Sequence, residues 1–214
     1  MVKIMKKNDI TNFIKILKEA YPDATCSLDF ETPFQIVVAV MLSAQCTDER
    51  VNKTTPELFK RCPTIKNFAD IDIKELEEVI HPCGFYRNKA KNIKLCAKQV
   101  LEKFNGEVPK TMDELLTLAG VGRKSANVIL LEAFGIANGI AVDTHVKRVS
   151  NRIGLSHEKG PEKIEQDLLK IFPKDSLKDI NHLFMWHGRN TCDSRTPENC
   201  SVKNFCEYYK KNCT

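Results

Sequence analysis

The sequence has 214 residues, which is enough for one large domain or two small ones with cores of their own. Hydrophobic residues make up 42% of the chain and charged residues 29%, a balance that excludes a disordered protein. The formal net charge of +5 weakly indicates a polyanionic partner, and no apolar run approaches the roughly 20 residues that span a bilayer. Because residues 1–10 lack the apolar centre of a signal peptide, we expect an intracellular, cytoplasmic protein.

The first part of the chain has the pattern of buried helices. Apolar residues recur at helical spacing from Ile10 to Leu17. Thr32 and Pro33 form an N-cap followed by a first-turn proline, which is a typical helix start. The segment 34–45 that follows is apolar on all sides, so we predict a helix buried in a core.

Further start and stop signals follow. Thr55-Pro56 repeats the start signal and predicts that a helix begins there. Asp72 with Glu75 resembles a capping box, in which side chains satisfy the first amides of a helix. Gly84 suits the position just past the end of that helix, where the backbone is commonly left-handed.

A long helix is predicted from Tyr86 to Phe104. It carries the densest basic run of the chain, opposed only by Glu102. The run consists of Arg87, Lys89, Lys91, Lys94, Lys98 and Lys103. A solvated helix face and a surface for a polyanion account for this run equally well.

Helical signals continue to the last quarter of the chain. Thr111 with Glu114 predicts a capped helix, and Gly160-Pro161 predicts the start of another. An apolar stripe marks one more helix at Leu177, Ile180 and Phe184. No segment alternates between apolar and polar residues with period two, so we predict an all-α fold.

A tight turn separates two of the predicted helices. One short helix ends near Leu118, and the next begins near Arg123. Gly120 and Gly122 between them let the backbone turn tightly and approach a ligand. Free amides and the helix dipole at the start of the second helix favour a phosphate. An ordinary hairpin between two helices has the same pattern, so the turn alone does not distinguish a phosphate-binding site from a structural hairpin.

Two residues near this turn could carry chemistry. Lys124 lies in the first turn of the second helix, beside Arg123 and the positive end of the helix dipole. A lysine beside other positive charge favours the free amine and becomes a nucleophile, although a phosphate contact is the alternative. Asp143 precedes the next apolar helical pattern, where it acts either as an N-cap or as a functional carboxylate.

The nine cysteines fall into two groups. An odd number in a chain of this kind argues against a disulfide framework. We predict that five scattered cysteines are small buried side chains: Cys26, Cys46, Cys62, Cys83 and Cys96. Four more gather near the C-terminus and predict a four-thiolate metal site: Cys192, Cys200, Cys206 and Cys213. Their spacing lacks the short chelating pair that zinc sites usually have.

These motifs together resemble the endonuclease III family of helix-hairpin-helix DNA glycosylases and abasic-site lyases. The resemblance lies in residues 118–130 and 142–155, with further similarity in 41–48 and 84–90. It implies that Lys124 attacks C1′ of a damaged nucleotide and that Asp143 assists it. A base inside a duplex must be flipped out to be reached.

The resemblance also assigns residues that bind DNA. It implies that Gln45 fills the space left by the flipped base and that Phe85 wedges the opposite strand. Further DNA contacts are implied at Gly120, Gly122, Arg123 and His145. The chain departs from the family at Ala119, where proline is usual, and at Phe85, where leucine is common.

The family also has a characteristic architecture, which we expect here. It has two helical domains with the DNA-binding cleft between them, a helix-hairpin-helix motif and a C-terminal iron–sulfur loop. The implied domains are residues 27–138, a helical barrel-like domain with the hairpin, and residues 1–26 plus 139–214. A [4Fe–4S] cluster is implied on the four terminal cysteines, although the gaps between them differ from the family's, most of all the middle gap.

The predicted function is a bifunctional glycosylase and lyase for oxidised pyrimidines in base excision repair. Its partner would be damaged double-stranded DNA, which implies a nucleoid-associated protein, and we expect a monomer without membrane contact. A glycosylase for oxidised guanine or mismatched adenine is the nearest alternative. A non-catalytic DNA-binding module is the alternative from another class, and it would not need Lys124 with Asp143.

Overall fold

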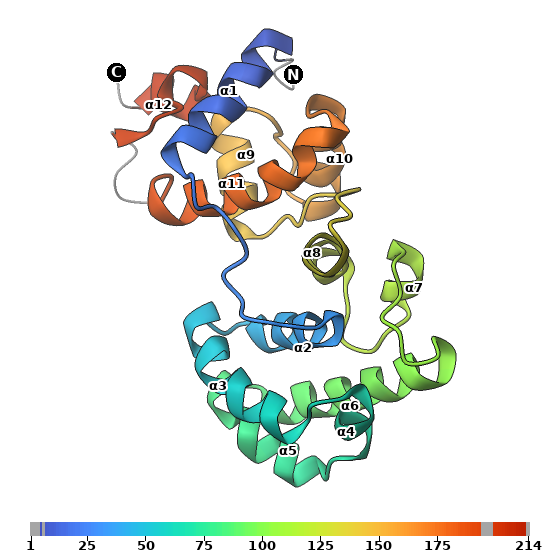
Figure 1. Ribbon diagram of the computed structural model, residues 1–214. Helices are drawn as coiled ribbons and strands as arrows, with labels where there is room; N and C mark the ends of the chain where they lie inside the picture. Colours follow the sequence, from blue (N-terminus) through green and yellow to red (C-terminus); the bar gives the residue numbers. More distant parts are fainter. Residues whose placement is uncertain (1–4, 6, 194–198, 213–214) are drawn as a thin grey trace. The chain divides into compact units, whose positions relative to one another are not determined.

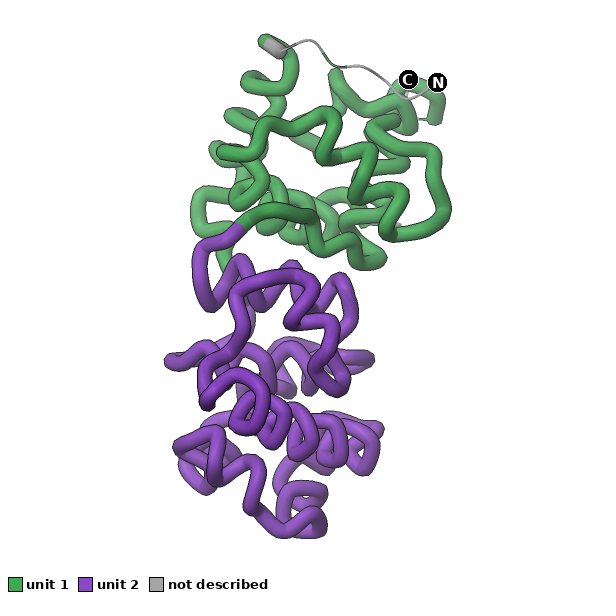
Figure 2. The backbone as a smooth tube through the Cα atoms, turned by 90° about the vertical axis from the view of Figure 1, so that its right-hand side faces the viewer, with its two compact units in different colours: residues 1–25, 137–214 green, residues 26–136 purple. Residues whose placement is uncertain are grey.

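The structure is a computed structural model that describes Met5, residues 7–193 and residues 199–212. Within these ranges the regular elements are α-helices and short 3-10 helices, so the predicted all-α fold is confirmed (Figure 1). The chain divides into two compact units, which Figure 2 colours separately. We call residues 26–136 the central unit, and residues 1–25 with 137–214 the terminal unit. No described helix is long and apolar enough to cross a membrane.

The central unit is built around α2 (Pro33–Ser43). Eight side chains of α2 are buried, namely Phe34 and all residues from Ile36 to Leu42, as the apolar run predicts. Thr32 caps the helix by accepting a hydrogen bond from the amide of Gln35 at 3.3 Å. The other helices of this unit are α3 (Asp48–Arg61), α4 (Ile65–Asp70), α5 (Ile73–Ile80), η1 (His81–Cys83), α6 (Tyr86–Lys103), α7 (Met112–Leu116) and α8 (Arg123–Phe134).

The helix start predicted at Thr55-Pro56 is wrong. Thr47 caps α3 by accepting from the amide of Arg50, and the helix then runs through Pro56. Val51, Thr55 and Leu58 are buried at helical spacing, so one face packs into the core along the whole helix. Pro56 points outward, and this packing outweighs the backbone hydrogen bond that proline removes.

The predicted end of α5 at Gly84 needs a smaller correction. A 3-10 turn, η1, separates α5 from Gly84. Gly84 has φ 68° and donates its amide to the carbonyl of His81 at 3.2 Å. The glycine therefore ends the 3-10 turn and not the α-helix itself. Of the scattered cysteines, Cys62, Cys83 and Cys96 are buried as predicted, while Cys26 and Cys46 are half-buried.

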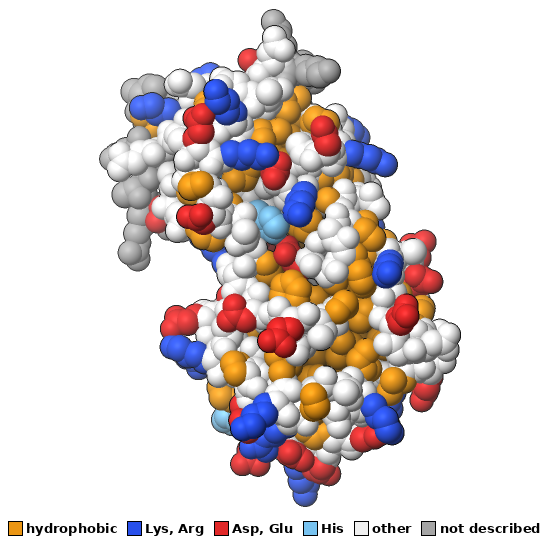
Figure 3. Space-filling model, viewed as in Figure 1, with side chains coloured by type: hydrophobic (Ala, Val, Ile, Leu, Met, Phe, Trp, Pro, Cys, Tyr) orange, Lys and Arg blue, Asp and Glu red, His pale blue; other side chains and the backbone are white. Residues whose placement is uncertain are grey.

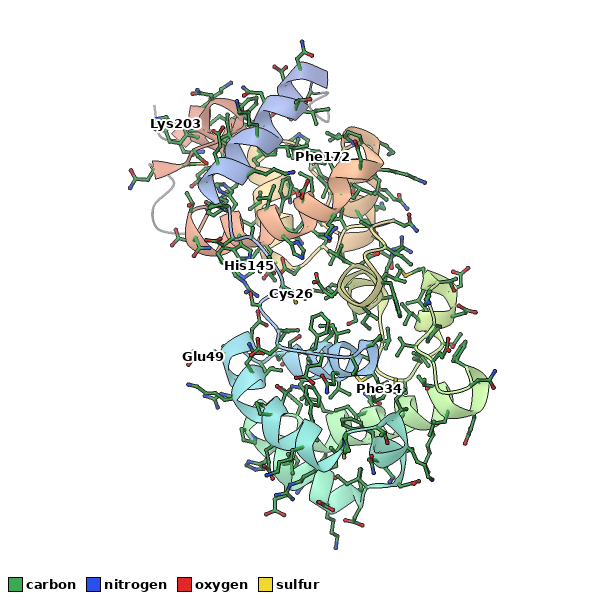
Figure 4. All side chains as sticks on the ribbon, viewed as in Figure 1. Cys26, Phe34, Glu49, His145, Phe172 and Lys203 are labelled. Atoms are coloured by element: carbon green, nitrogen blue, oxygen red, sulfur yellow. The ribbon has the colours of Figure 1, made fainter. Side chains whose placement is uncertain are left out.

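The terminal unit joins the two ends of the chain in one core. Phe13 of α1 (Lys7–Ala20) lies 6.3 Å from Phe172 and 6.0 Å from Phe184, measured between ring centres (Figure 4 labels Phe172). Aromatic side chains bury a large apolar area, so these three rings account for a large part of the packing in a small core. The other helices of this unit are α9 (Thr144–Ile153), α10 (Pro161–Ile171), η2 (Lys174–Ser176), α11 (Leu177–Asn190), η4 (Lys203–Phe205) and α12 (Glu207–Asn212).

Candidate functional site

The predicted hairpin connects α7 to α8 in the central unit. Gly120 has a left-handed backbone with φ 78°, which lets the chain reverse between the two helices. Gly122 is the N-cap residue of α8 and offers no side chain to cap it. No N-cap side chain therefore competes for the first amides of α8, where the helix dipole favours an anion.

Helix α6 holds the hairpin in position through hydrogen bonds and close packing. Gln99 Nε2 donates to the carbonyl of Thr117 at 3.3 Å, and Gln99 Oε1 accepts from the amide of Ala119 at 2.7 Å. A Cβ added to Gly120 would lie 3.0 Å from the Cβ of Asn92, so the turn touches α6 directly. Contacts within one unit therefore fix the position of the turn.

Lys124 lies in the first turn of α8 and is exposed, as is Arg123. The opposite face of α8 is buried through Ala126, Ile129 and Leu130, and the helix packs against α2. The buried face holds the helix in place, so Lys124 and Arg123 lie on the exposed side of its first turn.

Gln45 and Phe85 occupy two turns with the same unusual backbone. Gln45 follows α2 and has φ 53°, while Phe85 precedes α6 and has φ 47°. Residues other than glycine rarely adopt positive φ, and they keep it where their surroundings enforce it. Both side chains are exposed, and Phe85 shows 64% of its surface. A large apolar side chain held in this way is suited to wedge between base steps.

A buried lysine contacts the ends of the two helices that precede these turns. Lys89 is 6% exposed, and its Nζ donates to the carbonyls of Leu42 at 2.8 Å and Cys83 at 2.9 Å. From the sequence alone, Lys89 is only one member of the basic run. The signal that could have identified it is its spacing from Ile93 and Val100, which places it on the buried face of α6.

The basic run on α6 is therefore not one continuous surface. Lys94 is half-buried and donates to the carbonyl of Ile71. The remaining members are exposed: Arg87, Lys91, Lys98 and Lys103. On the face drawn in Figure 3, lysine and arginine side chains are scattered among acidic ones in both units.

Asp143 belongs to the terminal unit and is the N-cap residue of α9. Its Oδ1 accepts hydrogen bonds from the amides of His145 and Val146, both at 2.8 Å. Because both bonds end on the same oxygen, the cap does not require Oδ2. One carboxylate can thus cap the helix and still offer an oxygen for chemistry.

His145 is half-buried against α11 (Figure 4). A Cβ added to Gly188 would lie 2.7 Å from the Cβ of His145, so only glycine fits at that position of α11. His145 Nδ1 is 3.1 Å from Nη2 of Arg148. These contacts give His145 a packing role in the structure, and its predicted contact with DNA remains a prediction.

Two arginines of α9 hold the first of the four C-terminal cysteines. Arg148 Nε donates to the carbonyl of Cys192 at 2.7 Å, and Arg152 Nη1 is 3.7 Å from Cys192 Sγ. The Arg152 guanidinium also lies 4.4 Å from the ring centre of Tyr208, near the start of α12. The helix that carries Asp143 therefore also organises the cysteine loop.

Cys192, Cys200 and Cys206 line one small enclosed cavity in the terminal unit, together with Arg152 and His187. Burial raises the pKa of the Cys200 thiol to about 11, and it raises the pKa of Cys206 as well. His187 Nε2 is 3.6 Å from Cys200 Sγ, and burial lowers the pKa of this imidazole to about 4. The cavity thus gathers soft sulfur donors in a place where bare thiolates are unfavourable.

By their chemistry, these sulfur donors suit an iron–sulfur cluster, since buried thiolates need a metal's positive charge to form. Cys213, the predicted fourth ligand, lies outside the described residues. In the described part of the chain, no three Cys, His, Asp or Glu side chains are arranged to hold a metal ion. The cluster therefore stays a proposal.

The comparisons with known proteins agree on one family. Residues 38–174 match the HhH-GPD superfamily base excision DNA repair proteins. The endonuclease III of Synechocystis sp. is 51% identical over 94% of this chain and 93% of its own length. The endonuclease III of Escherichia coli is 40% identical over 97% of this chain and 99% of its own.

Two solved structures have a similar fold along nearly the whole chain. One is a non-covalent endonuclease III–DNA complex, with a TM-score of 0.90 and 40% identity over 98% of this chain and 99% of the other. The second is a trapped endonuclease III–DNA covalent intermediate, with a TM-score of 0.90 and 40% identity over 98% of this chain and 100% of the other. With a family match and relatives of this similarity, the chain belongs to the endonuclease III family of the HhH-GPD superfamily of base excision DNA repair proteins.

Proposed function

We propose that the chain is a bifunctional DNA glycosylase and abasic-site lyase that removes oxidised pyrimidines through a Schiff base on Lys124. The observation that carries the proposal is the exposed Lys124 on the first turn of α8, just past the Gly120–Gly122 turn. A relative that is 40% identical has been trapped as a covalent intermediate with DNA, which supports covalent chemistry in this chain as well.

The hairpin and the two strained turns bind and open the duplex. The amides at the start of α8 donate hydrogen bonds to a phosphate oxygen, which positions the DNA without reading its sequence. Phe85 enters the stack as a wedge, and Gln45 occupies the space of the extruded base. The damaged nucleotide then leaves the stack and becomes accessible to the nucleophile.

Lys124 carries out both chemical steps. Its neutral amine attacks C1′ as the bond to the damaged base breaks, and the electron pair of that bond leaves with the base. The sugar ring opens, and nitrogen and C1′ form a protonated imine. This imine acidifies the C2′ proton, whose removal expels the 3′ phosphate by β-elimination. One lysine thus removes the base and nicks the strand.

Asp143 supports these steps as a carboxylate. Its Oδ1 caps α9, and Oδ2 can stabilise positive charge on the sugar or accept a proton. The carboxylate does not need to leave its helix to do so. We assign it an assisting role because the attack itself requires an amine.

Cys192, Cys200, Cys206 and Cys213 would hold a [4Fe–4S] cluster. When bound, the cluster supplies four iron–thiolate bonds that tie the C-terminal loop together. Arg148 and Arg152 connect this loop to α9, so its order supports the helix that carries Asp143. We propose that the protein acts as a monomer on damaged double-stranded DNA in the nucleoid.

Borohydride trapping tests the nucleophile. Wild-type protein should form a stable covalent adduct with a duplex that contains thymine glycol or an abasic site. Lys124→Ala should bind this duplex with little loss, because one charge among several phosphate contacts is minor, but it should neither trap nor nick. Lys124→Arg keeps the charge but forms no imine and should also fail. Lys60→Ala, which changes an exposed lysine on α3, is the matched control and should behave as wild type.

The possible failures have different meanings. Trapping by Lys124→Arg would place the nucleophile elsewhere. Excision by wild-type protein without any trapping would mean that water attacks, as in a monofunctional glycosylase. Excision of oxidised guanine in preference to thymine glycol would correct the substrate class and leave Lys124 in its role.

A further inference from the structure

Lys89 makes contacts that the proposed chemistry does not yet use. It lies in the first turn of α6 and is 6% exposed. Its Nζ donates to the carbonyls of Leu42 at 2.8 Å and Cys83 at 2.9 Å. Leu42 is in the last turn of α2, and Cys83 is the last residue of η1. One ammonium group therefore joins the carbonyl ends of two helices that are far apart in the sequence.

Each of these carbonyls lies just before a residue with a left-handed backbone. Gln45 follows Leu42 by three residues, and Phe85 follows Cys83 by two. In the part of the chain that the structure describes, Gln45, Phe85 and Asn105 are the residues other than glycine with positive φ. Such conformations persist only where neighbouring contacts enforce them. Lys89 supplies a shared contact at the base of both turns.

The placement of Lys89 has an electrostatic cost. Burial lowers the pKa of Lys89 below its ordinary value, and the nearby thiols of Cys46 and Cys83 oppose this effect only in part. An apolar side chain of similar length would fill the same space without that desolvation. It would not bind two carbonyls at once, nor place a positive charge at the C-terminal end of α2, where the helix dipole favours it.

We propose that Lys89 is a positioning residue for base flipping. It fixes the Gln45 turn and the Phe85 turn relative to each other, so that the two side chains enter the duplex together. Lys89 itself is buried and touches neither DNA nor the reacting atoms. This inference rests on the proposed function, in which Gln45 and Phe85 replace and wedge bases.

The test compares Lys89→Met with Lys74→Met, which changes an exposed lysine on α5. Under single-turnover conditions, Lys89→Met should lose about tenfold in excision of thymine glycol and less than about twofold in cleavage at an abasic site. An abasic site has no base to extrude, so it depends less on the two turns. Lys74→Met should match wild type on both substrates.

Hydrogen exchange gives a second readout that does not depend on activity. The amide of Cys46 donates to Ser43 at 3.1 Å, and the amide of Gly84 donates to His81 at 3.2 Å. Both amides should exchange faster in Lys89→Met, while the core of the terminal unit stays unchanged. In a Gln45→Ala, Phe85→Ala background, Lys89→Met should cause no further selective loss of excision, because it acts through those residues.

Each outcome bears on a distinct claim. Equal losses on both substrates, or faster exchange in only one of the two turns, would overturn the role of Lys89. If Lys89→Met does not fold, Lys89→Gln keeps two N–H donors and must show the same selective loss to a smaller degree. If wild-type protein acts on neither substrate, the proposed function fails, and the exchange comparison still tests whether Lys89 ties the turns.

Discussion

At the scale of single residues, the structure removes an apparent choice between two roles for Asp143. The sequence left open whether this residue is an N-cap or a functional carboxylate. Both cap hydrogen bonds end on Oδ1, at 2.8 Å each, so the second oxygen is not needed for the cap. The two roles are therefore compatible in one side chain.

We predict that Asp143→Asn separates the two roles. The amide oxygen of asparagine can accept the same hydrogen bonds, so the free energy of unfolding should change by less than about 0.5 kcal/mol. Base excision should fall by about 100-fold or more, because the amide carries no charge and accepts no proton. Urea denaturation and single-turnover excision measure the two effects. Excision at the wild-type rate would mean that Asp143 is only a cap.

Lys89 shows why residue roles are harder to predict than helices. The sequence places six cations on one predicted helix, and the helix forms where expected, from Tyr86 to Lys103. Whether a lysine on it faces solvent depends on which side the rest of the fold covers. Lys89 meets the carbonyls of Leu42 and Cys83, and the contact with Leu42 spans 47 residues. No local pattern contains that contact.

At the scale of elements, the local signals predicted most helix starts and failed where packing overrode them. Thr32, Asp72, Thr111 and Asp143 all cap helices, since a capping hydrogen bond spans only two or three residues. The Thr55-Pro56 start was wrong because the buried face of α3 extends across it. The short helix α4 (Ile65–Asp70) was not predicted, although Thr64 caps it, and its contacts with α6 hold it in place.

The two turns that hold Gln45 and Phe85 should act in base flipping. We predict that Gln45→Ala and Phe85→Ala each reduce excision from a damaged duplex by about tenfold, since flipping costs a few kcal/mol. Cleavage at an abasic site should fall less. Single-turnover rates on the two matched duplexes provide the measurement. If both rates fall equally, these side chains only hold DNA.

The hairpin offers a matched pair of glycine substitutions. Gly120 has φ 78°, and an added Cβ would meet Asn92 Cβ at 3.0 Å. Gly120→Ala should therefore lower the free energy of unfolding by about 1–2 kcal/mol. An added Cβ at Gly122, where φ is −100°, meets nothing within 4 Å, so Gly122→Ala should cost less than about 0.5 kcal/mol. Similar losses in urea denaturation for both variants would contradict this account of the turn.

At the scale of the whole molecule, the chain passes from the terminal unit to the central unit and back. Phe13 packs against Phe172 and Phe184, so one core depends on contacts between the two ends of the sequence. Periodicity predicts which residues of a helix are buried, but not which distant helix covers them. The sequence itself showed no linker, and the expected domains came from the resemblance to a family.

The cysteine loop contacts α9, whose N-cap residue is Asp143. We therefore expect the loss of a loop cysteine to affect the whole protein. Protein purified without oxygen should be brown and contain iron. Cys200→Ser should lose the iron and lower the stability by about 2 kcal/mol, or roughly 4–8 °C in Tm. It should also reduce excision, since Arg148 and Arg152 would lose ordered partners at the loop. Cys26→Ser, which alters a half-buried cysteine outside the loop, should retain both iron and activity. Iron analysis, absorbance spectra and thermal unfolding check these outcomes, and zinc in place of iron would refute the assignment of the cluster.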